Sequence, residues 1–368
     1  MNLQRFVSVA RKELLHILRD PQTLFLTLFF PVLEMFLLGY ALDLNVRDIK
    51  TIIVDRAGTQ ESRALVKRFE NSDDFRVVAY GFSDDDVKAA MVKGTVRVGI
   101  IIPEDYSRRL EAGDSAQVLV AVDGTLSTIA SEAINVGNAV ALRESLERAL
   151  GDRPLPVEVR PRVLFNPDTR TPNFFIPGLL VVMCQMMATM LAASAIVREK
   201  ENGTLEQLYM TPVGRGEFIL GKMLPYLVLT ILELCFLTVL MRIFFQVPIA
   251  GYFLTLVLLA LPFMLTMLGC GLLISTRADT REAASQMVMG TLLPSIFLSG
   301  YVFSMDSMPT VFWLIGHCLP TTWLVDASRG VILRGAGWNE LWLHAVVLWA
   351  MALAMLLVVI VKVRKRLA

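Results

Sequence analysis

The chain has 368 residues, of which 55% are hydrophobic and 19% charged, and its formal net charge is +1. Soluble domains carry about a quarter of their residues as charged side chains, so this composition indicates a membrane protein. The nearly balanced charge gives no electrostatic reason to expect a nucleic-acid partner, and we expect none.

The first part of the sequence predicts a surface helix followed by a membrane span. Residues 1–21 are amphipathic and basic, which predicts a cytoplasmic helix lying on the membrane surface. The apolar run from Thr23 to Leu42 is long enough to cross a bilayer. A charged segment precedes this run and no small-residue cleavage site follows it, so residues 22–42 are expected to stay as the first transmembrane helix.

Residues 43–172 have the composition of a soluble domain. Strand-like and helical patterns alternate along them, which predicts a small α/β domain inserted between the first and second transmembrane helices. The expected strands are 51–55, 75–80, 96–102, 117–123 and a run near 157–164. The expected helices are 61–70, 84–93, 104–111 and 126–150. The acids of Asp84–Asp86 could form a cation site, but a capped helix start is the favoured interpretation.

Residues 173–368 contain further apolar runs of spanning length. These runs are Phe174–Val197, Phe218–Met241, Tyr252–Ile274, Ala283–Phe303 and Leu341–Val361. With the first span they predict an α-helical membrane protein of six transmembrane helices, five of them in residues 173–368. The run Val311–Leu319 is too short to span and ends at Pro320, so residues 304–337 are expected to form an outer re-entrant or interfacial hairpin.

Lysine and arginine in the short loops predict the orientation. If the N-terminus is cytoplasmic, the inside holds Arg5, Arg11, Lys12, Arg19, Arg198, Lys200, Arg215, Lys222, Arg277, Arg281, Lys362, Arg364, Lys365 and Arg366. The outside loops then hold only Arg242, Arg329 and Arg334. This asymmetry predicts that both termini are cytoplasmic and that the α/β domain is extracytoplasmic.

Catalytic signatures are lacking in the sequence. GEFILGKM, residues 216–223, fits the glycine-rich phosphate loop except that Met223 replaces the magnesium-binding hydroxyl, and no strand precedes it. We attribute this match to chance and expect the chain not to be an enzyme, with no metal site and no cofactor of its own.

The connection between the second and third spans, residues 198–222, is the most informative segment. Asn202-Gly203 interrupts the helix, and Thr204 with Gln207 forms a capping box that starts a short amphipathic helix. Such a helix, tied to two membrane helices, could transmit a push or could simply cover the membrane surface. The residues alone leave both interpretations open.

This segment, REKENGTLEQLYMTPVGRGEFILGK, resembles the signature of ABC-2 type permeases, in which E-x-G-T-x-E-x-L lies on the coupling helix. Other stretches are similar to the same family, closest to its branch of bacterial drug-efflux permeases. They are VGIIIPEDYSRRL (98–110), GLLIST (271–276) and LLPSIFLSGYVFSMDSMP (292–309). The resemblance covers essentially the whole chain.

The resemblance implies the permease subunit of an ATP-driven ABC exporter in the bacterial cytoplasmic (inner) membrane. A separate ABC ATPase subunit would hold ATP and Mg²⁺, and the loop 275–286 would be its second contact. The permease would work as a homodimer or a paralogous heterodimer among membrane lipids, with a periplasmic adaptor protein as a further partner left open. The expected cargo is an amphipathic small molecule: a drug-like compound, a lipid or a cation. The residues implied to seat in the ATPase are Glu199, Gly203, Thr204, Leu205, Glu206 and Leu208.

Further candidates lie in the membrane and at the outer hairpin. Glu34 and Glu233 fall inside predicted spans, where a charge costs about 2.5–3.5 kcal/mol, so each is a candidate for the substrate pathway or for an interhelical hydrogen bond. The outer hairpin resembles the short helices that plug the exit of such exporters, or it packs against a dimer partner. Candidate residues of an outer gate are Pro294, Gly300, Pro309 and Pro320.

Two other functions are compatible with a polytopic protein of this kind. An ion-coupled secondary transporter would show internal repeats with paired broken helices, and the sequence shows no such symmetry. A membrane-anchored receptor or scaffold would use the outer domain to bind a partner and would not need the coupling segment.

Overall fold

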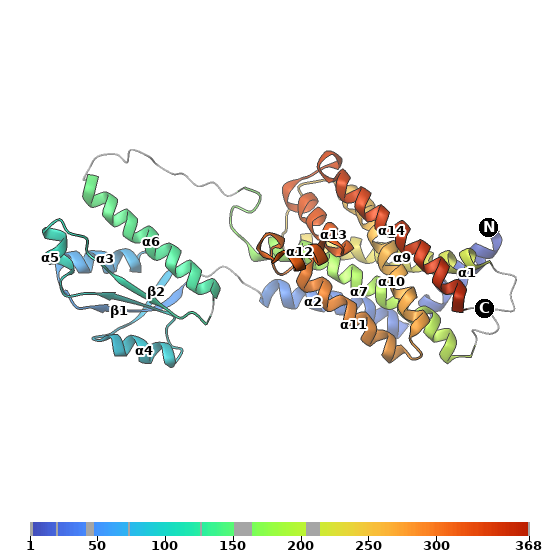
Figure 1. The fold of residues 1–368 in the computed structure, drawn as a ribbon, viewed down its shortest axis with the longest axis horizontal. Coiled ribbons are helices and arrows are strands. Elements are labelled where there is room, and N and C mark those ends of the chain that lie inside the picture. The colour runs from blue at the N-terminus through green and yellow to red at the C-terminus, as the bar shows by residue number, and fades with distance from the viewer. Residues whose placement is uncertain are drawn as a thin grey trace. The chain divides into compact units, whose positions relative to one another are not determined.

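The computed structural model describes residues 3–19, 21–41, 48–72, 74–125, 127–150, 164–203 and 214–366. The chain divides into two compact units, Asp43–Arg162 and a second formed by Met1–Leu42 with Val163–Ala368. Each unit is shown in Figure 1 and is described separately.

The unit Asp43–Arg162 is an α/β sandwich around a four-stranded sheet of order β2-β1-β3-β4. Its strands are β1 (Ile49–Asp55), β2 (Phe75–Tyr80), β3 (Val98–Ile102) and β4 (Leu119–Val122). Its helices are α3 (Gln60–Glu70), α4 (Asp84–Val92), α5 (Tyr106–Glu111) and α6 (Ser127–Leu150). β1 pairs in parallel with β2 and β3, and β4 joins β3 in antiparallel fashion.

Alternation of side chains gives this sheet two apolar faces. Ile53 and Ile100 face one cluster, which includes residues of α3, α5 and α6, whereas Ile52 and Ile101 face a second cluster with Val87 of α4. Helices therefore cover both faces, as expected for a mostly parallel sheet. Ser83 caps α4 through the amide of Asp86, which confirms the capped helix start expected at Asp84–Asp86. The strand expected near 157–164 falls almost wholly outside the described residues.

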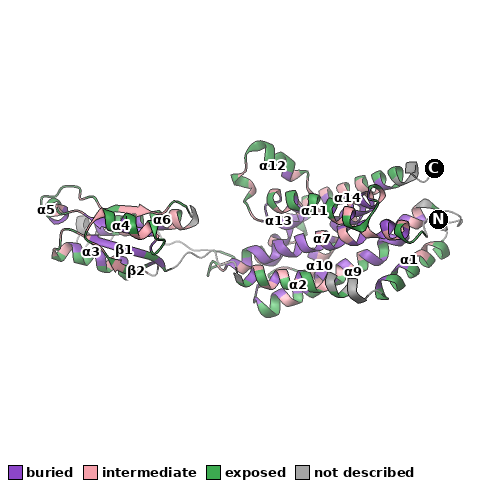
Figure 2. Ribbon diagram, turned by 90° about the horizontal axis from the view of Figure 1, so that it is seen from below, coloured by how far each residue is buried: buried purple, intermediate pink, exposed green. Residues whose placement is uncertain are grey.

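The second unit is a helical bundle. Its helices are α1 (Leu3–Leu18), α2 (Pro21–Ala41), α7 (Thr171–Glu201), α9 (Arg215–Phe244), α10 (Phe253–Arg277), α11 (Arg281–Leu298), α12 (Thr310–His317), α13 (Pro320–Arg329) and α14 (Trp338–Arg366), with a 3₁₀ turn at Met305–Ser307 and a π-helical turn at Gly330–Arg334. α7 lies at the centre and contacts α2, α9, α10, α11 and α13. Figure 2 shows that α7 is buried along almost its whole length.

Among the described residues, four helices are long and apolar enough to cross a membrane: α7, α9, α10 and α14. α2 and α11 occupy the first and fifth predicted spans, but neither meets that criterion over its described residues. α11 ends at Leu298, before the predicted Phe303, because Gly300 takes a left-handed φ of +81° that breaks the helix. The bundle is thus a mostly helical, polytopic architecture, and the number of six spans stays a prediction.

Candidate functional site

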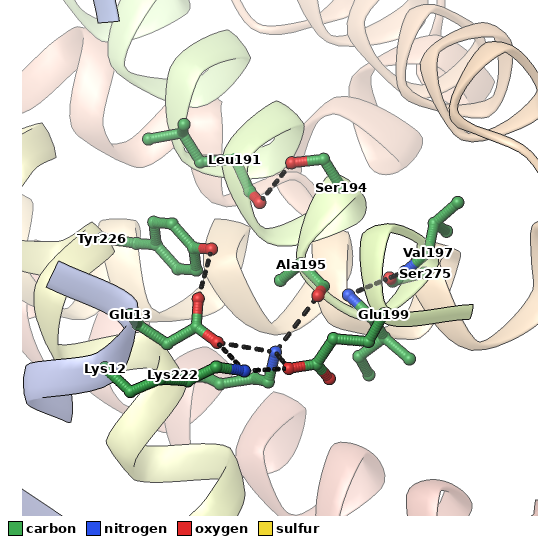
Figure 3. A network of polar contacts seen from close by, with 11 residues as sticks. Lys12, Glu13, Leu191, Ser194, Ala195, Val197, Glu199, Lys222, Tyr226 and Ser275 are labelled. Carbon is green, nitrogen blue, oxygen red and sulfur yellow. Dashed lines mark hydrogen bonds and ion pairs between the residues drawn. The ribbon is translucent and has the colours of Figure 1, made fainter. Parts of the chain in front are cut away.

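Three buried charges meet where α1, α7 and α9 converge. Glu13 of α1 is 3% exposed, Glu199 of α7 is 5% exposed and Lys222 of α9 is 1% exposed. Together with Lys12 and Tyr226 they form what we call the ionic cluster, which Figure 3 shows in detail. The cluster lies between the ends of the two helices that flank the predicted coupling segment.

Lys222 is the centre of the ionic cluster. Its Nζ lies 2.9 Å from Glu13 Oε1 and 2.9 Å from Glu199 Oε1, and it donates to the Ala195 carbonyl of α7 at 3.1 Å. Lys12 Nζ adds a second cation, 2.7 Å from Glu199 Oε1. Two ammonium groups therefore face two carboxylates, so the formal charges of the cluster cancel.

The stability of the ionic cluster depends strongly on the positions of its charges, because these charges are removed from water. Each buried ion loses several kcal/mol of hydration, which is recovered only if oppositely charged partners and hydrogen bonds are held in good geometry. The cluster meets this requirement only while α1, α7 and α9 keep their mutual positions. It therefore ties the three helices together at this end of the bundle.

The packing of α1 against α9 brings Glu13 to the ionic cluster. A Cβ atom built on Gly221 would lie 2.9 Å from Val9 Cβ and 3.2 Å from the Phe6 carbonyl oxygen, so only glycine allows the two helices to approach this closely. Glu13 then follows on the inner face of α1, and the Tyr226 hydroxyl donates to its Oε2 at 3.1 Å. α1 is amphipathic, and its two buried residues are Glu13 and Ile17.

The end of α7 is also fastened to the α10–α11 connection. The Ser275 hydroxyl of α10 accepts from the amides of Ile196 and Val197 at 3.0 and 3.2 Å. Lys200 Nζ donates to the Ala278 carbonyl at 2.9 Å, and Arg281 Nε lies 2.8 Å from Glu201 Oε2. The loop 275–286, predicted as a second ATPase contact, is therefore bonded directly to the helix that leads into the coupling segment.

The structure describes only part of the predicted coupling residues. α7 ends at Glu201, and Gly203 adopts φ +67°, the left-handed conformation that commonly closes a helix. Thr204, Leu205, Glu206 and Leu208 lie outside the described residues.

The resemblance implied that Glu199 seats in the ATPase, but this side chain is buried among Lys12, Lys222 and the bundle. It therefore offers little surface to a second chain. The first glutamate of the E-x-G-T-x-E-x-L pattern falls on Glu201, which is partly exposed and pairs with Arg281. The geometry therefore favours a structural role for Glu199, which is to hold α7 in place.

The two acids expected in the membrane have different surroundings. Glu34 of α2 is partly buried, whereas Glu233 of α9 is 1% exposed, and neither of its carboxylate oxygens has a hydrogen-bond partner within the described part of the chain. The interhelical hydrogen bond considered for Glu233 is therefore not formed among those residues. The structure does not bring Glu34 and Glu233 together with the ionic cluster.

The candidate gate residues are distributed over α11, α12 and α13 and the turns beside them. Pro294 lies within α11 and Gly300 follows its end, while Pro309 precedes α12 and Pro320 is the first residue of α13. The hairpin predicted for 304–337 contains α12 and α13, which we refer to as the outer hairpin. Arg329 holds it against the bundle by donating to the carbonyls of Gly300 and Tyr301 at 2.9 and 3.0 Å.

Sequence reasoning missed Glu13, Lys222 and Tyr226 as site residues. A usable signal existed for Lys222, because a lysine inside an apolar run needs a buried counter-ion or a route to the membrane surface. Glu13 carried a similar signal as an acid on the inward face of an otherwise basic helix.

Acidification is expected to release α1. Burial alone would raise the pKa of Glu13, but the Lys222 ammonium, with Lys12 and the Tyr226 hydroxyl, lowers it below the ordinary value of 4.5. Because the pKa of Glu13 is lowered in the folded state, the stability that its ionised carboxylate contributes is complete above pH 4.5. That stability is lost as the pH falls through the lower, folded-state pKa. Hydrogen exchange of residues 3–18, corrected for intrinsic rates, should therefore accelerate as the pH falls below 4.5. Glu13→Gln should lose most of this pH dependence, and an equal acceleration in that variant would contradict the assignment.

Comparison with known proteins agrees with this architecture. Residues 21–361 match the ABC-2 family transporter proteins. The chain is 29% identical to the probable multidrug ABC transporter permease YbhS of Escherichia coli, over 91% of this chain and 90% of that protein. It is 26% identical to the probable multidrug ABC transporter permease YbhR of the same organism, over 92% and 93%. It is 22% identical to the linearmycin resistance permease protein LnrN of Bacillus subtilis, over 91% and 92%. The chain belongs to the ABC-2 family of transporter proteins.

Proposed function

We propose that the chain is the membrane-spanning permease subunit of an ATP-driven exporter whose ATPase is a separate protein. In this proposal the ATPase subunit holds ATP and Mg²⁺. The permease crosses the bacterial cytoplasmic membrane six times, with both termini inside and residues 43–172 outside. Two permease chains, identical or paralogous, enclose the pathway.

The observation that carries this proposal is the position of the ionic cluster. Glu199 lies in the last turn of α7, which ends at Glu201. Lys222 lies about two turns into α9, which begins at Arg215. Both helices that flank residues 204–213 are thus bonded to each other and to α1 through Lys222. A displacement applied to that segment would be passed to three helices at once rather than absorbed in a loose loop.

The proposed mechanism is alternating access. ATP binding would bring two ATPase chains together and displace the coupling segments, and α1, α7 and α9 would follow as a unit. Their movement would reshape the cavity between the two permease chains. The names of the relatives, which refer to multidrug transport and linearmycin resistance, support an amphipathic small molecule as the cargo.

ATPase stimulation tests this function. The chain is co-expressed with a candidate ABC ATPase subunit, and the complex is purified and reconstituted in nanodiscs. We expect the two proteins to co-purify and the ATPase rate to rise with an amphipathic drug. No co-purification with that ATPase, or an ATPase rate indifferent to every amphiphile, would count against the proposal.

Glu233 offers a test of the cargo class. It is a buried carboxyl with no partner among the described residues, and a cationic cargo would supply one. Glu233→Gln is expected to lower export of a cationic amphiphile about tenfold, the effect of one lost charged hydrogen bond, and to leave a neutral analogue unchanged. Thr230→Val is the control, because its hydroxyl is buried on the same helix and donates to the Leu227 carbonyl within that helix. Equal losses for both cargoes would exclude Glu233 as a cation contact.

A further inference from the structure

The outer hairpin is hydrogen-bonded to the middle of α7. Gln185 of α7 is 3% exposed, and its Oε1 accepts from the Thr321 hydroxyl of α13 at 2.7 Å. Its Nε2 donates to the Ser295 hydroxyl of α11 at 3.0 Å. One amide side chain therefore joins the central helix, the fifth predicted span and the outer hairpin.

The other end of α13 is bonded to α7 as well. The Ser328 hydroxyl donates to the Pro177 carbonyl at 3.0 Å, and Arg329 Nε donates to the Phe174 carbonyl at 3.3 Å. α13 thus meets α7 at both of its ends, in a region where Thr321 and Ser328 are at most 1% exposed.

Separating α13 from α7 would break these hydrogen bonds between the two helices. Each buried donor or acceptor that loses its partner costs about 1–3 kcal/mol, and the Gln185 amide oxygen would lose its contact to the Thr321 hydroxyl. The outer hairpin should therefore follow a displacement of α7 rather than slide over it. The opposite end of the same helix carries Glu199, which is held in the ionic cluster.

We propose that Gln185 is a positioning residue that makes the outer hairpin move as one body with α7. A displacement that enters at the ionic cluster then reaches the outer face of the protein through a single helix. This inference rests on the proposed function, because it assigns the route by which the ATPase opens and closes the outer end of the pathway.

Thr321→Val tests the route with a substitution of nearly equal shape. It removes the hydroxyl that bonds to Gln185, and Thr321→Ser restores a hydroxyl at the same position. Thr322→Val is the matched control, because Thr322 is also buried but its hydroxyl donates to the Gly316 carbonyl within the outer hairpin itself. Gln185→Met removes the amide itself while keeping a side chain of similar length, and it serves as a second variant if Thr321→Val does not fold.

Two readouts are measured on the full complex with its ATPase. The first is the amount of drug exported per ATP hydrolysed. The second is the labelling rate of Cys318, an exposed cysteine that follows α12, by a membrane-impermeant maleimide with and without vanadate-trapped nucleotide. Cys184 is buried, and Cys235 and Cys270 lie within α9 and α10, so the impermeant reagent reports on the outer hairpin.

We expect Thr321→Val to hydrolyse ATP but to export about tenfold less drug per ATP, and to lose the nucleotide-dependent change in Cys318 labelling. Thr321→Ser and Thr322→Val should keep both. If wild-type protein couples transport to ATP and Thr321→Val couples equally well, the role of Gln185 is overturned while the exporter function stands. If wild-type protein shows no ATP-dependent export, the proposed function fails and this inference fails with it.

Discussion

Replacing Lys222 with methionine is expected to destabilise the membrane unit by about 3–5 kcal/mol, because removal of one partner leaves buried charges uncompensated. Lys222 is 1% exposed and contacts Glu13 and Glu199 at 2.9 Å, so no water can replace its ammonium without opening the bundle. The midpoint of thermal unfolding in detergent should fall by about 5–10 °C.

Two further variants show whether this loss comes from charge or from packing. Lys200→Met removes a more exposed lysine, which donates to the Ala278 carbonyl and lies 3.7 Å from Asp279, and it should cost clearly less, about 1 kcal/mol. The triple variant Lys222→Met, Glu13→Gln, Glu199→Gln leaves no buried ion at these three positions and should recover most of the lost stability. A midpoint in Lys222→Met as high as in Lys200→Met would contradict the ionic cluster as a tie between helices.

Leu205→Asp and Leu208→Asp are each expected to abolish co-purification with the ATPase subunit. The sequence predicts that both leucines lie on the apolar face of a short helix capped by Thr204. A charge in the centre of an interface costs enough to weaken binding more than about 100-fold. The measurement is the ratio of ATPase to permease after affinity purification from detergent.

The control for these variants is an aspartate placed on an exposed leucine elsewhere. Leu119 in β4 is 58% exposed and belongs to the other unit, so Leu119→Asp should leave the complex intact. If Leu205→Asp and Leu208→Asp retain as much ATPase as Leu119→Asp, the segment 198–222 is not the docking site.

The local elements of the α/β unit follow closely from sequence. The run at 75–80 is the strand β2 with the same bounds, and the pattern 126–150 is α6 at Ser127–Leu150. Short apolar runs between turn residues determine such elements because the information lies within a few neighbouring positions.

The ionic cluster could not be predicted in the same way. Its charges come from residues 13, 199 and 222, and only the packing of three helices brings them together. In the sequence, Lys222 belongs to a segment that matches a phosphate loop by chance, and this match is unrelated to its place in the ionic cluster. A single sequence does not reveal that Gly221 allows close packing against Val9, because the sequence does not say which helix lies beside it.

The function of individual residues was also harder to predict than the family. The role of Glu199 in docking, which the resemblance implies, stays a prediction, and its side chain lies buried beside Lys12 and Lys222. Neighbouring acids two positions apart on a helix point in different directions, so the alignment of a motif does not determine which one faces a partner.

Reconstituted transport tests the central claim most directly: that mechanical work reaches this chain from a separate ATPase. Proteoliposomes containing the permease with its ATPase should accumulate an amphipathic drug only when MgATP is supplied on the cytoplasmic side. Liposomes with the permease alone should show no transport under an imposed proton or sodium gradient. Accumulation driven by the ion gradient in the absence of any ATPase would contradict the account.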